Sequence, residues 1–245
     1  MKQKFFIIVL ISFIANVFAQ NNNIDLQLSL GPTLSIPNTS ELTNSDVDGR
    51  PQIKSKINIG LFVLPSIKYS LNEKSSLDFG IGYYLDRFSI EDKLGAVTNE
   101  GNRNIHQIQT PINYNFHFGT NKSYEFGIGA FASFVLSAKE KGDVITNNSE
   151  IDIVDPNDPT FSSNTTVSYS KDIKDNYNTV NFGAFLQIKK NITFSESKKG
   201  FIFLKINQYF NAIKNNNSES DINQYLEFKN EKEPMTVNIG IGILL

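Results

Sequence analysis

The chain has 245 residues, with 23 Lys and Arg against 25 Asp and Glu and a formal net charge of −2. This balance lacks the excess of basic residues that is typical of nucleic-acid-binding proteins, so no nucleic-acid partner is expected. The sequence contains no cysteine, which excludes disulfides, thiol chemistry and Cys-ligated metal sites.

The first residues predict an export signal. MKQKFFIIVLISFIANVFAQ places Lys2 and Lys4 before an apolar run, which is followed by a small-residue exit ending at Ala19. A membrane anchor is the alternative, but the run falls short of the ~20 residues that a spanning helix needs. We therefore expect residues 1–19 to be a cleaved signal peptide and residues 20–245 to form one exported domain.

Alternation of apolar and polar residues recurs eight times along the mature chain. In IHQIQTPINYNFHF, residues 105–118, the even positions from Ile108 onward are apolar or aromatic apart from one threonine. This period of two is typical of a strand with one apolar and one polar face, and each run has about the length of a tilted membrane strand. The eight apolar rows lie within residues 24–30, 57–69, 77–85, 108–118, 124–136, 180–188, 202–210 and 235–245.

The connections between these rows alternate in length. NEKSS and GTNKS, after the second and fourth rows, are short, and ITFSESKKG after the sixth is moderate. The polar, Asn-rich stretches around residues 36–52, 91–104, 139–176 and 214–233 are expected to be long exposed loops. Short turns on one rim and long loops on the other are typical of an outer-membrane barrel, with both termini on the short-turn, periplasmic rim.

The volume of a barrel decides which face points outward. About forty Ile, Leu, Phe, Val and Tyr side chains would not fit inside an eight-stranded barrel, whose interior is only just wide enough to be filled by side chains. The opposite parity carries small residues that a narrow interior accepts: Gly31, Gly60, Gly80, Gly82, Gly127, Gly129, Gly183, Gly240 and Gly242. The prediction is an all-β, eight-stranded antiparallel up-and-down transmembrane β-barrel of a bacterial outer membrane. A two-sheet sandwich with its apolar faces packed together is the alternative.

The inward face also carries charge near the periplasmic rim. Seven residues share inward parity there: Asp25, Lys68, Asp78, His117, Glu125, Lys189 and, slightly higher, Lys205. Acids and bases in a narrow lumen are expected to pair with one another, as buried charge requires. The set predicts a polar plug rather than an open pore. For any single member, a place at a strand end in interfacial water is the alternative.

The order of the segments resembles a known family. INIGLFVLPSIKYSLNEKSSLDFGIGYYLDRF, then IQTPINYNFHFG, YEFGIGAFASFVLSA and a closing VNIGIGILL are similar to the PorT-like outer-membrane β-barrel proteins of Bacteroidota. The resemblance covers almost the whole mature chain and carries no catalytic signature. It implies insertion by the barrel assembly machinery, although such barrels commonly end on an aromatic residue and this chain ends on Leu245. One branch of the family is associated with protein secretion.

The sequence contains no clear catalytic or metal-binding motif. His106 and His117 are the only histidines and are expected near opposite rims, so they do not share a site. Asp152, Asp155 and Asp158 lie in the longest loop but do not match the calcium-loop spacing. An acidic solvated loop is the default and structural calcium the alternative. No enzyme activity and no cofactor are expected.

Two functions from different classes remain. The first is a structural, surface-display or secretion and envelope accessory protein with a plugged lumen. Its expected partner is outer-membrane lipid, and a secretion or envelope complex is a further candidate partner. The second is a transport protein with a narrow conduit. Barrel girth favours the first, because wide aqueous channels appear at 16 or more strands. A soluble lipocalin-like carrier would need an apolar interior, which the volume argument opposes.

Overall fold

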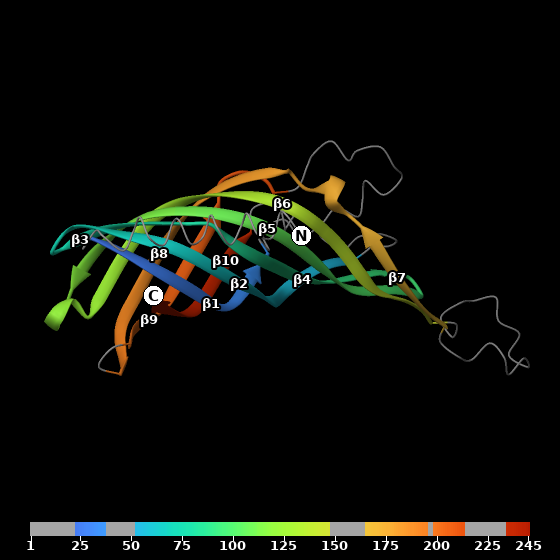
Figure 1. Cartoon of the computed structure of the whole chain (residues 1–245). Helices are drawn as coiled ribbons and strands as arrows, with labels where there is room; N and C mark the ends of the chain where they lie inside the picture. Colours follow the sequence, from blue (N-terminus) through green and yellow to red (C-terminus); the bar gives the residue numbers. More distant parts are fainter. Residues whose placement is uncertain (1–22, 38–51, 148–164, 196–197, 214–233) are drawn as a thin grey trace, which may run out of the picture.

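The computed structural model describes residues 23–37, 52–147, 165–195, 198–213 and 234–245. These residues form long antiparallel strands joined by short turns (Figure 1). The strands are β1 Ile24–Ile36, β2 Gln52–Asn72, β3 Ser75–Gly80, β4 Gly82–Leu94, β5 Val97–Phe118, β6 Tyr124–Thr146, β7 Thr165–Asp172, β8 Val180–Ser195, β9 Lys198–Tyr209 and β10 Met235–Leu244. Two single-turn 3₁₀ helices accompany them, η2 Thr120–Lys122 and η5 Lys174–Asn176. In the described part of the chain, no helix is long and apolar enough to cross a membrane.

The strands close into a ring of eight positions. β1 pairs with β2 on one side and with β10 on the other, so the first and last strands seal the barrel. β3 and β4 share one position, since both lie between β2 and β5, and β7 and β8 share another, since both pair with β6. The predicted eight-stranded up-and-down barrel is therefore confirmed, with two of its strand positions interrupted.

The apolar face points outward. Ile128 and Ile239 expose 53% and 52% of their surface, whereas the side chains of Asn115 and Asn181 are fully buried. Burial of polar residues under an exposed apolar surface is the reverse of a soluble sandwich, and it is the arrangement that a lipid-facing barrel requires. The face assignment made from volume and glycine parity is confirmed.

Aromatic rings fill the space above the inward glycines. A Cβ atom at Gly242 would lie 2.2 Å from Cζ of Phe201, and one at Gly183 would lie 2.4 Å from Cζ of Phe131. Contacts this short show that the rings rest directly on the glycine backbone. The rings therefore occupy the space that the glycines leave free inside the barrel, and they narrow the lumen. The inward phenylalanines were not identified in the sequence.

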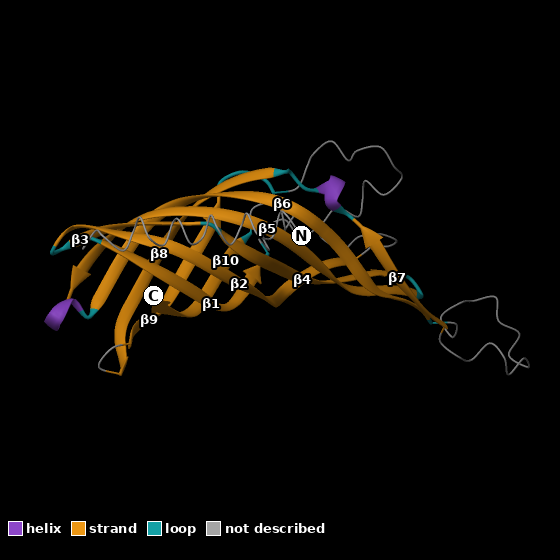
Figure 2. Ribbon diagram, in the orientation of Figure 1, coloured by secondary structure: helices purple, strands orange, loops and turns teal. Residues whose placement is uncertain are grey.

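The rims differ in the length of their connections. One rim, here the turn rim, carries the Glu73–Lys74 turn and the Gly119–Ser123 connection, together with the start of β1 and the end of β10. These two strand ends meet there, because the amide N of Leu245 donates to the carbonyl O of Leu26 at 2.9 Å. The opposite rim is here called the extension rim, because β4, β5, β6 and β7 continue on that side beyond the ends of β1, β8, β9 and β10 (Figure 2).

The expected loop at residues 91–104 is wrong. β4 runs on to Leu94 and β5 begins at Val97, so the connection is a two-residue turn in which Gly95 has φ +55°. Residues 139–146 and 165–172 are strand as well. These segments are polar on both faces, so they carry no period-two hydrophobic signal, and backbone pairing alone identifies them. The rest of the expected loops, Asp152, Asp155, Asp158 and the expected signal peptide lie outside the described residues.

Candidate functional site: the plugged lumen

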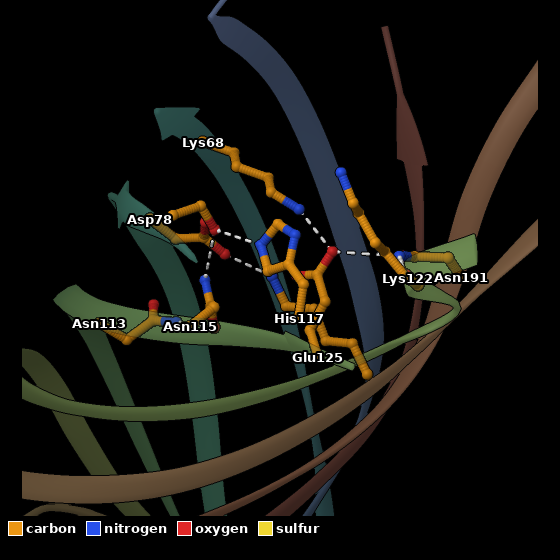
Figure 3. Close-up of polar contacts among 10 residues, drawn as sticks. Lys68, Asp78, Asn113, Asn115, His117, Lys122, Glu125 and Asn191 are labelled. Carbon is orange, nitrogen blue, oxygen red and sulfur yellow. Dashed lines mark hydrogen bonds and ion pairs between the residues drawn. The ribbon is translucent and has the colours of Figure 1, made fainter. Parts of the chain in front are cut away.

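Two buried ion pairs cross the lumen near the turn rim. Nζ of Lys68 on β2 donates to Oε1 of Glu125 on β6 (Figure 3). In the second pair, Nζ of Lys189 on β8 donates to Oδ2 of Asp78 on β3. The four side chains expose between 2% and 10% of their surface. Each pair joins strands three positions apart around the ring, so each spans the lumen rather than a single strand interface.

Neutral polar side chains surround these pairs. Nδ2 of Asn191 donates to Oε1 of Glu125 at 3.1 Å, which gives this carboxylate oxygen a second donor. Nε2 of His117 lies 3.1 Å from Oγ of Ser76, and Nδ2 of Asn115 donates to the same hydroxyl at 3.3 Å. His117 is therefore part of the hydrogen-bonded lining of the lumen (Figure 3).

Asp25 and Lys205 lie at the two edges of this region. Asp25 is half-buried and lines a vestibule of about 750 Å³ at the turn rim, together with Lys68 and His117. Lys205 lies deeper and is 2% exposed, with Nζ 4.2 Å from the ring centroid of Phe185 and 5.5 Å from that of Tyr84. Among the described residues no carboxylate pairs with Lys205. The expected acid–base pairing therefore does not extend to this lysine, and aromatic faces hold its ammonium group instead.

A second polar layer centres on the hydroxyl of Tyr209. Nε2 of Gln107 and Nε2 of Gln109 lie 2.9 and 3.1 Å from this oxygen. The hydroxyl lies 3.3 Å from Oδ2 of Asp86, which also accepts from Gln107. All four residues are at most 2% exposed. The layer ties β4, β5 and β9 together across the barrel interior.

An apolar cap closes the lumen toward the extension rim. Ile173 and Tyr177, which flank η5, and Ile213, which follows β9, are each 4% exposed. They belong to one core cluster with Phe88, Phe131 and the ring of Tyr209, among others. The amide N of Asn178 donates to the carbonyl O of Ile213 at 2.7 Å and fastens the two capping segments to each other. The sequence reasoning missed this cap, because Ile173 was assigned to an exposed loop and Tyr177 and Ile213 lie outside every apolar row.

The space left inside the plug is small. A cavity of about 20 Å³ lies among Asp78, Lys189, Lys205 and the rings of Phe201 and Phe203. A buried water needs roughly 10–15 Å³ of such volume, so this cavity has room for about one water molecule.

A third polar network lies in the strand extension. Nε of Arg103 on β5 donates to Oε2 of Glu140 on β6 at 2.7 Å, and the hydroxyl of Tyr169 on β7 donates to Oε1 at 2.8 Å. Burial and the hydrogen bond to Glu140 both raise the pKa of Tyr169. The network holds β5, β6 and β7 rigidly together beyond the apolar band.

The two histidines lie far apart on β5. His106 points outward, with Nδ1 2.5 Å from the hydroxyl of Tyr83, whereas His117 lines the lumen near the turn rim. Eleven residues of strand separate them, roughly 35 Å at the usual rise. Within the described ranges, no group of three or more His, Asp and Glu side chains is placed to hold a metal ion.

Comparison with known proteins decides the family. A family model described as outer membrane protein beta-barrel domain matches residues 18–211. The chain belongs to this family. The outer-membrane barrel has no match among curated proteins.

Several solved outer-membrane proteins are similar to this barrel. OprG of Pseudomonas aeruginosa is 10% identical, with a TM-score of 0.39 over 90% of this chain and 95% of its own. Neisserial surface protein A is 11% identical, with a TM-score of 0.38 over 91% and 97%. Ail of Yersinia pestis is 11% identical, with a TM-score of 0.36 over 91% and 99%.

Proposed function

We propose that this outer-membrane barrel is a non-conducting structural protein that anchors and displays its strand extension. The observation that carries the proposal is closure of the lumen at three successive levels: two ion pairs, the layer around Tyr209 and the apolar cap. An aqueous conduit would need all three to open, and the side chains of each level are at most 10% exposed. The remaining cavity of about 20 Å³ does not connect them into a path for solutes.

The strand extension, formed by β7 and the adjoining ends of β4, β5 and β6, is the part of the barrel that would bind partners. Its strands continue past the apolar band and are locked by the Arg103–Glu140–Tyr169 network, so they form a rigid platform rather than flexible loops. The start of β1, the end of β10 and the short turns lie on the opposite rim, which supports an orientation with the extension outside the cell. The PorT-like resemblance supports an accessory role in a secretion or envelope complex, after export by residues 1–19 and insertion by the barrel assembly machinery.

Narrow-conduit transport is the second candidate. The vestibule of about 750 Å³ at the turn rim favours it, because a polar mouth is where a conduit would begin. The vestibule ends at the Lys68–Glu125 pair, however, so conduction would require that pair to break. The two candidates therefore differ in whether small solutes ever pass.

A liposome-swelling assay separates them. Proteoliposomes that contain the barrel are diluted into isotonic arabinose or glycine, and light scattering reports solute entry. The proposal expects swelling no faster than in protein-free vesicles. A variant in which Tyr177→Ser and Ile213→Ser loosen the cap should still exclude solutes, because the ion pairs remain. Rapid swelling with the wild-type protein would contradict a non-conducting barrel and support transport.

A further inference from the structure

The apolar band ends abruptly on the outward face of β4, β5 and β6. Tyr83, Ile108 and Phe134 are register neighbours and form its last complete row. On β6 the exposed Leu136 follows at a bulge, and the next outward row is Leu85, His106 and Ser137. The three rows beyond it are polar: Arg87, Asn104 and Lys139, then Ser89, Asn102 and Lys141, then Glu91, Glu100 and Asp143. This is the level at which lipid headgroups replace acyl chains around a barrel.

Three bases gather on the outward face directly above that boundary. Arg87 and Lys139 flank Asn104 in one row, and Lys141 lies in the next row along β6. Arg87 and Lys139 are two strand spacings apart, about 10 Å, and Lys139 and Lys141 are about 7 Å apart along the strand. Lys139 and Lys141 are exposed and Arg87 is half-buried. We call these three residues the outer basic cluster.

The neighbouring acids leave this cluster uncompensated. Nζ of Lys56, beside Ser89, donates to Glu91, so that base is already paired. Asp172 lies opposite Lys139 in the register, but its Oδ1 accepts from the amide N of Lys174 at 2.9 Å. Among the described residues, no carboxylate forms an ion pair with any member of the cluster.

Two further features set the direction in which the cluster can act. Among the described residues, Asp172 is the acid that shares a row with Lys139, and the next row of acids, Glu91, Glu100 and Asp143, lies farther from the apolar band than the bases do. The outward positions of β8, β9, β10 and β1 toward the same rim carry no charge, and among them are Val180, Gln208, Met235 and Ile36. In the described part of these four strands, no base lies at the level of the outer basic cluster.

We propose that the outer basic cluster binds a phosphate-bearing headgroup of a lipid in the leaflet on the extension side. The outward apolar residues below the cluster contact the acyl chains of that lipid. Arg87, whose Nε is held by Oδ1 of Asn104 at 2.7 Å, presents the rest of its guanidinium to a phosphate. Lys139 and Lys141 add two point charges at the membrane surface. The site is independent of whether the lumen conducts.

The chain contains no tryptophan, so a single introduced tryptophan reports on the lipids beside it. Tyr83→Trp places the reporter one row below the cluster. Phe182→Trp places a control reporter on the outward face of β8, away from the basic residues. Each barrel is reconstituted in phosphatidylcholine with increasing fractions of phosphatidylglycerol that carries brominated acyl chains, which quench nearby tryptophan. Folding of every variant is checked by circular dichroism.

The proposal expects the Tyr83→Trp reporter to favour phosphatidylglycerol over phosphatidylcholine by about fivefold or more, and the Phe182→Trp reporter to show no preference. Arg87→Gln, Lys139→Gln and Lys141→Gln together should abolish the preference, while Lys139→Arg with Lys141→Arg should retain it. Equal preference at both reporters, or an unchanged preference in the triple variant, overturns the proposal. Inorganic phosphate should weaken the preference more than chloride of the same ionic strength, because free phosphate competes with the lipid phosphate for the same three bases.

Discussion

Removal of the Asp78 carboxylate is expected to destabilise the barrel strongly. Lys189 would keep its charge in a site where the two side chains expose only 6% and 5% of their surface. Loss of one partner of a deeply buried pair typically costs ~3–5 kcal/mol. The ring of Phe201, whose centroid is 4.9 Å from Nζ of Lys189, remains and offsets roughly 1 kcal/mol. Asp78→Ala should therefore lower the free energy of unfolding by about 2–4 kcal/mol.

The double variant isolates the ion pair. Asp78→Ala combined with Lys189→Met removes both charges, and a buried pair replaced by apolar groups is often close to neutral in stability. The double variant should therefore recover at least about half of the loss, which appears as a coupling energy of about 1–2 kcal/mol or more. Urea-induced unfolding of the barrel in phospholipid vesicles, followed in both directions, gives these free energies.

The exposed pair Lys122–Glu73 is the matched control. Its N···O distance is 3.7 Å, and its side chains are 51% and 89% exposed. Glu73→Ala should change stability by less than about 0.5 kcal/mol, as is usual for surface pairs. A cost for Asp78→Ala no greater than that of Glu73→Ala, or a double variant no more stable than the single one, would refute the view that paired charges close the lumen.

The other predictions concern the lipid face, the interior and the orientation. Ile239→Arg, at a position 52% exposed near mid-strand, should cost about 2–4 kcal/mol in vesicle unfolding, whereas Thr166→Arg in the extension should be tolerated; equal costs would contradict the face assignment. Gly240→Val should lower the free energy of unfolding by about 1–3 kcal/mol through overpacking, since a Cβ there would lie 2.6 Å from Cε1 of Phe203. An unchanged urea midpoint of unfolding would show that the ring moves freely. An epitope tag near Asn157 should be labelled on intact cells and one near Glu73 only after permeabilisation; the opposite result would invert the orientation.

The barrel was predictable because its physical signal is local and repeated. Alternation of apolar and polar residues marks a strand wherever one face meets lipid, so rows such as 124–136 and 235–245 were located correctly. The signal fails where both faces meet water. The β4–β5 hairpin around Gly95 carries polar residues on both faces, so it was assigned to a loop although it is fully paired strand.

The contents of the lumen were only partly predictable. Inward parity placed Lys68, Glu125, Asp78 and Lys189 near one rim, but parity gives no partner, because pairing across a barrel depends on strand stagger. Lys205 shared the same parity and instead lies between two aromatic rings. The cap formed around Ile173 arises from residues outside any strand, so no periodicity marks it.

The current across a planar lipid bilayer tests the closed lumen most directly. The wild-type barrel, inserted in either orientation and held at moderate voltage in salt solution, is expected to carry no steady current, since the ion pairs, the layer around Tyr209 and the apolar cap all lie in series. Asp78→Ala should give at most brief, small openings, because the other two layers stay in place. Large and stable open channels in the wild-type protein would contradict a plugged barrel and favour transport.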